Sequence, residues 1–123
     1  MSRAAFIVAS GLSVRQTHAV LGNISSAVSA AGTTQGTATQ LTADVNLVTT
    51  ATEGQGVILP AMTLGDVIWV ANGTSGGSAA DFYVYPVSGG KLNGQTVDVG
   101  LLLPPAKAAV FVALNSLDCL VHY

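Results

Sequence analysis

The chain has 123 residues and a formal net charge of −2, and only 8% of its residues are charged, against about 25% in a typical soluble domain. Half of the residues are hydrophobic, which excludes disorder caused by high charge and low hydrophobicity. Lys and Arg together number four, which is too few to form a basic surface for nucleic acid. The length suffices for one domain with a real core, and no apolar run approaches the roughly 18 residues of a membrane helix. We therefore expect an exterior built largely from small and apolar residues, with neither nucleic acid nor a membrane as partner.

Residues 1–39 are rich in Ala, Ser, Gly and Thr and are predicted to form an N-terminal arm. Residues at spacings near three and four, typical of a weak amphipathic helix, are Val14, His18, Leu21, Ile24 and Val28. Gly22 and Asn23 interrupt that pattern, so an extended arm is the alternative to a partly helical one. The apolar run near Met1 spans about six residues, shorter than the roughly 7–15 of a signal peptide, so we expect a protein made in the cytoplasm.

From residue 40 onward the pattern changes to short β-branched or apolar runs separated by turn signals. The predicted strands are 45–50, 57–60, 67–71, 81–86, 106–114 and 117–123. Asn93-Gly94 is a strong two-residue hairpin signal between 91–92 and 95–97, and Pro104-Pro105 excludes a central strand over 101–105. With no helix among these runs, residues 40–123 are predicted to be an all-β domain, a small antiparallel β-sandwich or β-barrel.

Several predicted strands are apolar on both faces. Val67 and Trp69 lie on one face of their strand and Ile68 and Val70 on the other, because side chains alternate along a strand. A two-layer β fold needs only one apolar face per strand. The surplus favours a second face that contacts another protein, most simply another copy of the same chain, although scattered apolar residues on a surface are common.

Few residues offer catalytic or metal-binding chemistry. The carboxylates lie at or near predicted strand ends and turns, where carboxylates usually bind local backbone: Asp44, Glu53, Asp66, Asp81, Asp98 and Asp118. A glycosidase needs two of them to converge, and the spacing singles out no pair. Cys119 and His122 are three residues apart, which puts them on opposite faces of a strand and weakens a nucleophile–base pairing, and His18 has no metal-ligand spacing to either.

We therefore predict no catalytic residue, no cofactor and no metal, and a protein that is not an enzyme. Cys119 is the only cysteine, so it cannot form an intrachain disulfide, and its apolar surroundings predict a buried small hydrophobe.

Six segments in fixed order resemble a β-rich module of structural proteins from tailed bacteriophages. The segments are 41–50, 54–60 ending in Leu-Pro, 65–72 with Gly-Asp-Val-Ile-Trp-Val-Ala-Asn, 82–86 with Phe-Tyr-Val-Tyr-Pro, 89–94 ending in Asn-Gly, and 108–113. The resemblance covers about residues 33–123 and implies a virion protein, for which trimers are common. It brings no catalytic residues with it, and residues 1–32 do not match.

Among virion roles, the sequence favours a capsid decoration (cement) protein that binds the outer capsid surface as a homotrimer and stabilises the shell. One short domain without heptads is unlike the long chains of fibres and spikes. The expected partners are further copies of itself and the major capsid protein, and the expected location is the virion surface. The alternatives are a tail-fibre, head-fibre or spike component that binds a host receptor or glycan and, from another class, a small cell-envelope hydrolase.

Two sets of residues are predicted to make these contacts. The predicted subunit interface consists of Trp69, Phe82, Tyr83, Tyr85 and Phe111. The predicted capsid-contacting residues of the arm are Arg3, Phe6, Val14, Arg15, Leu21, Ile24 and Val28. Aromatic residues at alternating strand positions are as common in a core as at an interface, so the pattern alone does not divide these residues between the two.

Overall fold

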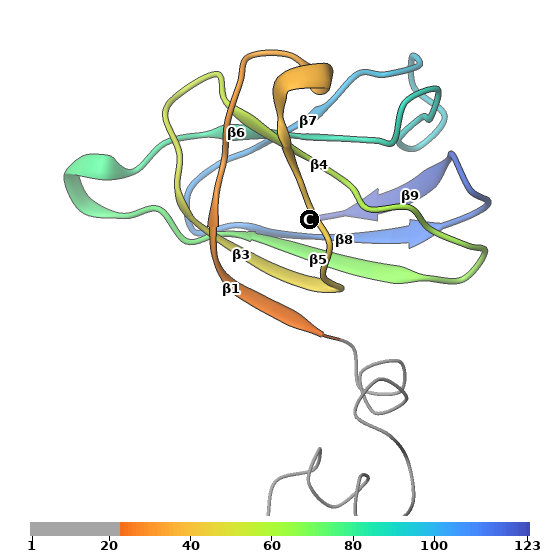
Figure 1. Ribbon diagram of the computed structural model, residues 1–123, viewed down its shortest axis with the longest axis horizontal. Helices are drawn as coiled ribbons and strands as arrows, with labels where there is room; N and C mark the ends of the chain where they lie inside the picture. The colour runs from red at the N-terminus through yellow and green to blue at the C-terminus, as the bar shows by residue number, and fades with distance from the viewer. Residues whose placement is uncertain (1–22) are drawn as a thin grey trace, which may run out of the picture.

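A computed structural model describes residues 23–123 as two β-sheets, one lying over the other (Figure 1). The five-stranded sheet has the order β1 (Ile24–Ser29), β3 (Val45–Thr50), β5 (Val67–Asn72), β8 (Ala108–Ala113) and β9 (Cys119–His122). The four-stranded sheet has the order β2 (Thr39–Gln40), β4 (Gly56–Ile58), β6 (Phe82–Tyr85) and β7 (Leu101–Leu103). Two single-turn 3-10 helices, Gln35–Thr37 and Gly76–Ser78, complete the described elements. None of these helices is long and apolar enough to cross a membrane.

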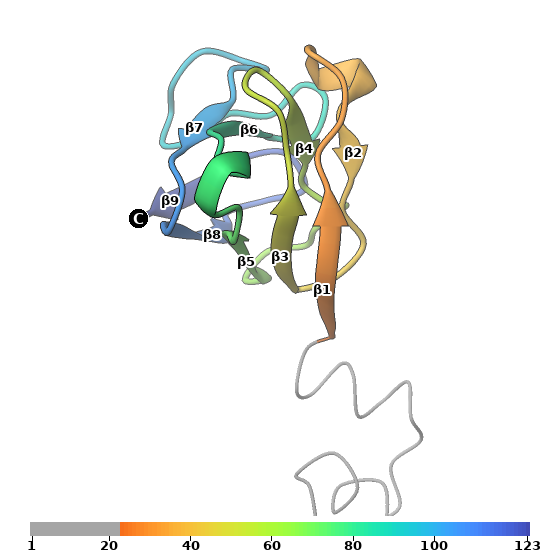
Figure 2. The ribbon, with the colours of Figure 1, turned by 90° about the vertical axis from the view of Figure 1, so that its left-hand side faces the viewer.

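The first six strands alternate between the two sheets, so that each passage of the chain through one sheet is followed by a passage through the other (Figure 2). Consequently β1, β3 and β5 are parallel to one another, and so are β2, β4 and β6. Two neighbouring parallel strands need a crossover connection, which is commonly a helix. Here the connection between two parallel strands of one sheet contains a strand of the other sheet. The antiparallel strand pairs are β5 with β8, β6 with β7, and β8 with β9.

The prediction of an all-β fold is confirmed, but both sheets mix parallel and antiparallel pairs where antiparallel sheets were predicted, and neither sheet closes into a barrel. The sequence pattern locates β3, β4, β5, β6, β8 and β9 but misses β1, β2 and β7. It contains no signal for strand direction, since alternation of apolar residues is the same in both kinds of pairing.

The sheets begin inside the segment predicted to be an arm. β1 is the edge strand of the five-stranded sheet, and over its six residues the helical alternative is wrong. Asn23 anchors the start of β1, because its side-chain Oδ1 accepts a hydrogen bond from the Asp44 backbone N–H (2.8 Å) and its own N–H donates to the Asp44 carboxylate (3.3 Å). Residues 1–22 of the predicted arm lie outside the described residues.

Asn93 and Gly94 form the predicted tight turn, but no hairpin. Both have positive φ, 50° and 69°, as a type I′ turn requires, and the Gln95 N–H donates to the Leu92 carbonyl oxygen at 2.9 Å. The flanking residues do not pair as strands. Instead, Leu92 forms an isolated parallel bridge with Cys119 of β9. The predicted turn at Asn93-Gly94 is therefore confirmed, whereas the predicted hairpin is wrong. Tertiary contacts pair Leu92 with Cys119 and not with the residues that follow the turn.

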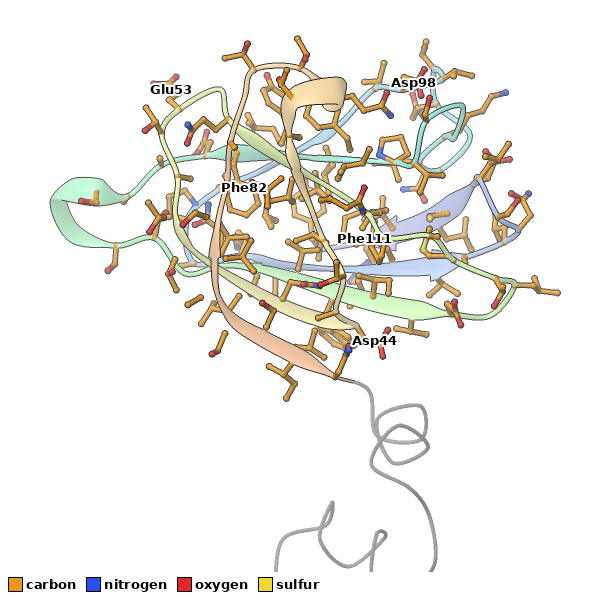
Figure 3. The ribbon with its side chains drawn as sticks, viewed as in Figure 1. Asp44, Glu53, Phe82, Asp98 and Phe111 are labelled. Carbon is orange, nitrogen blue, oxygen red and sulfur yellow. The ribbon has the colours of Figure 1, made fainter. Side chains whose placement is uncertain are left out.

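Both sheets contribute to a single core between them. Phe82 of β6 and Phe111 of β8 are completely buried and lie between the two layers (Figure 3). Around them are packed residues from both sheets, which include Val48, Val57, Leu59, Ile68, Val70, Val84, Leu103, Ala109 and Cys119. The buried residues of β5, β6 and β8 alternate with more exposed ones, as the predicted strand periodicity requires.

One polar network crosses the core at the end of β5. The Asn72 side-chain Nδ2 donates to the carbonyl oxygens of Ala80 (2.8 Å) and Leu103 (2.9 Å), and its Oδ1 accepts from the N–H and the hydroxyl of Thr74. Asn72 is 3% exposed and all of its amide groups are paired, so the cost of its burial is offset. Because Leu103 belongs to β7, this amide ties the five-stranded sheet to the four-stranded one.

Candidate interaction surface

The strands of residues 23–123 contain no Asp, Glu, Lys or Arg. The charged side chains of this region all lie in turns and connections, as Asp44, Glu53 and Asp98 do in Figure 3. Natural sheets commonly place charges on exposed faces and edges to prevent association with other sheets. The exposed faces of both sheets here lack that protection, which makes them the first candidates for contact with another protein.

The outer face of the five-stranded sheet is mainly apolar and has the exposed His122 at its β9 end. Cross-strand pairing joins Ile24 to Val45, Val45 to Trp69, Trp69 to Val110, and Val110 to His122, so that one row of residues spans all five strands. A second row joins the neighbours Val67, Val112 and Leu120. Trp69 is 47% exposed and Leu120 51%. We call this surface the apolar face: Ile24, Val45, Leu47, Val67, Trp69, Val110, Val112, Leu120 and His122.

Only one of the five predicted interface residues lies on the apolar face. Trp69 does, whereas Phe82 and Phe111 are fully buried in the core and are therefore not surface residues, which corrects that part of the prediction. Tyr83 and Tyr85 lie half-buried on the outer face of the other sheet. The predicted aromatics thus occupy the core and two opposite faces, and they do not form one patch.

Tyr85 is already packed within its own chain. A Cβ added to Gly56 or Gly100 would lie 2.6 Å and 2.9 Å from its ring, so the two glycines make room for the ring on the sheet. Its ring centroid is 5.8 Å from that of Tyr83. Burial, and secondarily the neighbouring Tyr83, raise the pKa of the Tyr85 hydroxyl. This tyrosine pair covers its own sheet, in contrast to the open Trp69.

The two predicted arm residues that are described have different environments. Ile24 is 72% exposed at the start of β1, whereas Val28 is 9% exposed and belongs to the core, so Val28 is not available for contact with a shell. The remaining predicted arm residues, Arg3, Phe6, Val14, Arg15 and Leu21, lie outside the described residues.

Val110, Val112 and Leu120 were missed as interface candidates. The alternation in 108–113 separates Ala109 and Phe111 from Val110 and Val112, but both sets are apolar, and the pattern does not tell which set faces inward. In the folded chain Phe111 faces inward, because its large ring fills the space between the two sheets. Val110 and Val112 therefore face outward.

The apolar face continues around the β9 edge of the sheet. A shallow hollow of about 310 Å³ is lined by Val110, Val112, Leu120, His122, Asn93 and Val121. A second hollow of about 150 Å³ adjoins it, since both include Asn93 and Val121. We call the lining of this second hollow the β9-edge surface: Leu92, Asn93, Gln95, Val99, Gly100, Leu101 and Val121. Two apolar surfaces therefore meet along β9.

Four of the six carboxylates bind backbone N–H groups, but only Asp66 binds the backbone of its own turn as the sequence predicts, and the other three reach segments nine or more residues away in the sequence. Asp66 accepts from the Thr63 N–H (2.9 Å), Asp98 from the Gly89 N–H (2.7 Å) and Asp118 from the Lys91 N–H (3.0 Å). Asp44 accepts from the Asn23 N–H at 3.3 Å.

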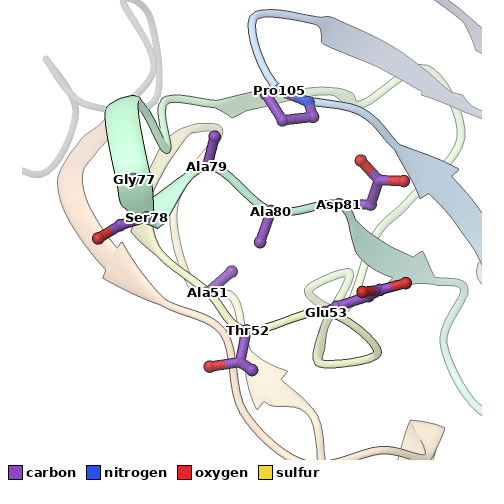
Figure 4. Close-up of a pocket in the computed structure, with 9 residues that line it drawn as sticks. All are labelled: Ala51, Thr52, Glu53, Gly77, Ser78, Ala79, Ala80, Asp81 and Pro105. Atoms are coloured by element: carbon purple, nitrogen blue, oxygen red, sulfur yellow. The ribbon is translucent and has the colours of Figure 1, made fainter.

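The other two carboxylates, Glu53 and Asp81, line the same hollow of about 500 Å³ (Figure 4). Its remaining lining is Ala51, Thr52, Gly77, Ser78, Ala79, Ala80 and Pro105, so this hollow contains no His, Cys, Lys or Arg. Among the described residues no three His, Cys, Asp or Glu side chains gather as a metal site would require.

Cys119 and His122 do not form a catalytic pair. Cys119 is completely buried, in contact with the Met62 sulfur at 3.9 Å, whereas His122 is exposed on the opposite face of β9. Burial, with a smaller contribution from Asp118, raises the pKa of the Cys119 thiol to about 11. The thiol is thus kept neutral and enclosed, unlike the exposed thiolates of reactive cysteines.

Comparison with known proteins yields no match, either to a protein-family model, to a curated protein, or to a solved structure.

Proposed function

We propose that this chain is a virion structural protein, a capsid decoration protein that binds the outer surface of the shell as a homotrimer and stabilises it. The observation that supports this most is the uncharged apolar face, which spans all five strands of one sheet. The ordered resemblance of residues 33–123 to phage structural modules supplies the biological setting. Many weak contacts, repeated over a shell by trimers, sum to strong attachment through multivalency.

The test is the copy number of the protein in purified virions of the phage that encodes it. Quantitative mass spectrometry against the major capsid protein should find roughly hundreds of copies per particle, as multivalent coverage of a shell requires. The purified protein should also co-sediment with expanded shells. A copy number near a dozen, or absence from the particle, would contradict a decoration role.

A fibre or spike component that binds a host glycan is the second candidate, and exposed Trp69 is the observation that favours it. Aromatic rings on open surfaces are suitable platforms for sugars, but Tyr83 and Tyr85 are engaged on the other sheet. This alternative predicts binding to host cells or to a glycan array that Trp69→Ala abolishes. A decoration protein should bind shells and give no signal on such an array.

A further inference from the structure

The chain contains two Asn-Gly pairs, and the structure gives them opposite environments. They are Asn72-Gly73 at the end of β5 and Asn93-Gly94 in the tight turn beside β9. A glycine after asparagine has no side chain to obstruct its own backbone nitrogen. That nitrogen is the nucleophile of spontaneous deamidation, a reaction that requires only water and hydroxide. The two pairs therefore have the same intrinsic chemistry, and the fold decides which of them reacts.

Deamidation of Asn93 begins when the backbone nitrogen of Gly94 loses its proton to hydroxide and attacks Cγ of the side chain. The new bond between this nitrogen and Cγ closes a succinimide ring. The bond between Cγ and Nδ2 breaks, and Nδ2 takes a proton from water and leaves as ammonia. Water then adds to one of the two ring carbonyl groups. The product is aspartate or isoaspartate, in which the main chain runs through Cβ and Cγ, and either one carries a carboxylate in place of a neutral amide.

The fold blocks this reaction at Asn72. The residue is 3% exposed, and its amide is fully paired, through Nδ2 with two backbone carbonyl oxygens and through Oδ1 with Thr74. The attacking nitrogen is engaged as well, because the Gly73 N–H donates to the Val48 carbonyl oxygen at 2.8 Å. Hydroxide reaches this buried pair only in unfolded molecules, which are fewer than about one in 1,000 for a typical domain.

The Asn93-Gly94 pair is held by one contact at the protein surface. Both residues are exposed, and the Gly94 N–H donates no hydrogen bond within the part of the chain that the structure describes. Nδ2 of Asn93 donates to the Val121 carbonyl oxygen (3.0 Å), and Oδ1 accepts from the Val121 N–H (2.8 Å). The amide must leave both partners before Cγ can be attacked. Two exposed hydrogen bonds slow the reaction only roughly 5- to 150-fold relative to the unfolded chain.

We propose that Asn93 is a site of spontaneous deamidation in the folded protein, and that the reaction permanently breaks the contact that closes the edge of β9. Aspartate has no N–H for the Val121 carbonyl oxygen and places a carboxylate oxygen beside it. Isoaspartate retains neither bond, because the former side chain is now main chain. Neither product can restore the original pair of hydrogen bonds, so the change proceeds in one direction.

The new charge alters an uncharged surface. Asn93 lines both hollows beside β9, and their remaining lining contains no Asp, Glu, Lys or Arg. Deamidation therefore converts a closed, uncharged edge into an open, negatively charged one. Its rate rises with pH, since the attacking nitrogen must lose a proton. The reaction is independent of the decoration role, because the purified protein is sufficient for it.

The experiment follows both Asn-Gly pairs in one sample of the full-length protein. Purified protein is incubated at mildly alkaline pH, either folded in buffer or unfolded in guanidinium chloride, and peptide mass spectrometry measures conversion at each asparagine with time. The two sites should convert at similar rates in the unfolded chain. In the folded chain Asn93 should convert at least about ten-fold faster than Asn72. Equal rates in the folded chain, or conversion of Asn93 only in denaturant, overturn the assignment.

A substitution in β9 tests whether the Val121 contact controls the rate. Val121→Pro removes the N–H that binds Oδ1 of Asn93, and proline is tolerated on an edge strand where its nitrogen faces away from the sheet. Conversion of Asn93 should rise roughly two- to ten-fold, because one of the two restraining bonds is lost. Circular dichroism checks that the variant is folded. An unchanged rate in the folded variant overturns control by this contact.

The converted wild-type protein tests the opening of the edge without any substitution. Anion exchange separates it from the starting protein by its additional negative charge. Hydrogen exchange at the Val121 amide should be faster in proportion to the isoaspartate content, since isoaspartate offers this amide no acceptor. Exchange that stays equally slow in isoaspartate-rich protein overturns the opening of the edge.

Discussion

At the scale of single residues, Asn72 is the polar group whose loss should cost most. Asn72→Ala would remove the amide partner of the Leu103 carbonyl oxygen and of the Thr74 N–H, while the Thr74 hydroxyl and the Ala80 carbonyl oxygen would keep only their bond to each other (3.1 Å). Each unpaired buried group costs about 1–3 kcal/mol, and we expect a total loss near 3 kcal/mol in urea unfolding. Asn115→Ala is the matched control, because Asn115 also accepts two backbone N–H bonds but is exposed; its loss should be about 1 kcal/mol. Equal losses would show that the Asn72 network does not stabilise the fold.

Cys119 makes a prediction about pH. Its thiol has an ordinary pKa of 9.0 and a pKa of about 11 in the folded chain. Because the folded pKa is raised, the stabilisation is fully present below pH 9 and is lost as the pH rises from about 9 to 11. Urea midpoints should fall more steeply over that range for the wild type than for Cys119→Ala, in which the other titrating groups are the same. Parallel curves for the two proteins would contradict this.

At the scale of elements, backbone groups of 91–93 pair with Cys119 at the edge of β9, and the side chain of Asn93 closes that edge at Val121. Asn93 donates from Nδ2 to the Val121 carbonyl oxygen (3.0 Å) and accepts at Oδ1 from the Val121 N–H (2.8 Å), as a neighbouring strand would. Asn93→Gly keeps the positive φ of 50° free of strain and removes only these bonds. We expect a loss of about 1–2 kcal/mol and faster hydrogen exchange of the Val121 amide. Unchanged exchange at Val121 would mean that other contacts protect the edge.

At the scale of the whole molecule, strands far apart in sequence become neighbours because the chain alternates between sheets. Val45 of β3 lies beside Trp69 of β5, and the intervening residues form β4 in the other sheet. This coiled path puts the uncharged segments of five strands on one face. The apolar face is thus a product of topology, since no single strand carries enough of it to serve as an interface.

The sequence by itself determined six of the nine strands in residues 23–123, the Asn93-Gly94 turn and the distribution of charge, and it missed β1, β2 and β7. Alternation located β3, β5, β6 and β8, the Asn93-Gly94 pair defined a type I′ turn, and Asp66 was correctly assigned to the backbone of its own turn. These are properties of short segments, in which side-chain periodicity and backbone conformation act over a few residues.

Only the tertiary structure decided strand direction, the edge position of β1 and the division of aromatics between core and surface. Phe82, Phe111 and Trp69 have the same local pattern, an aromatic ring in an apolar strand, and differ only in which side of the sheet faces the other layer. That choice is made by the packing of two sheets around one core, which depends on the volumes of residues distant in sequence. The small share of charged residues has its structural consequence for the same reason. Folding gathers uncharged residues from five strands on the outer face of one sheet.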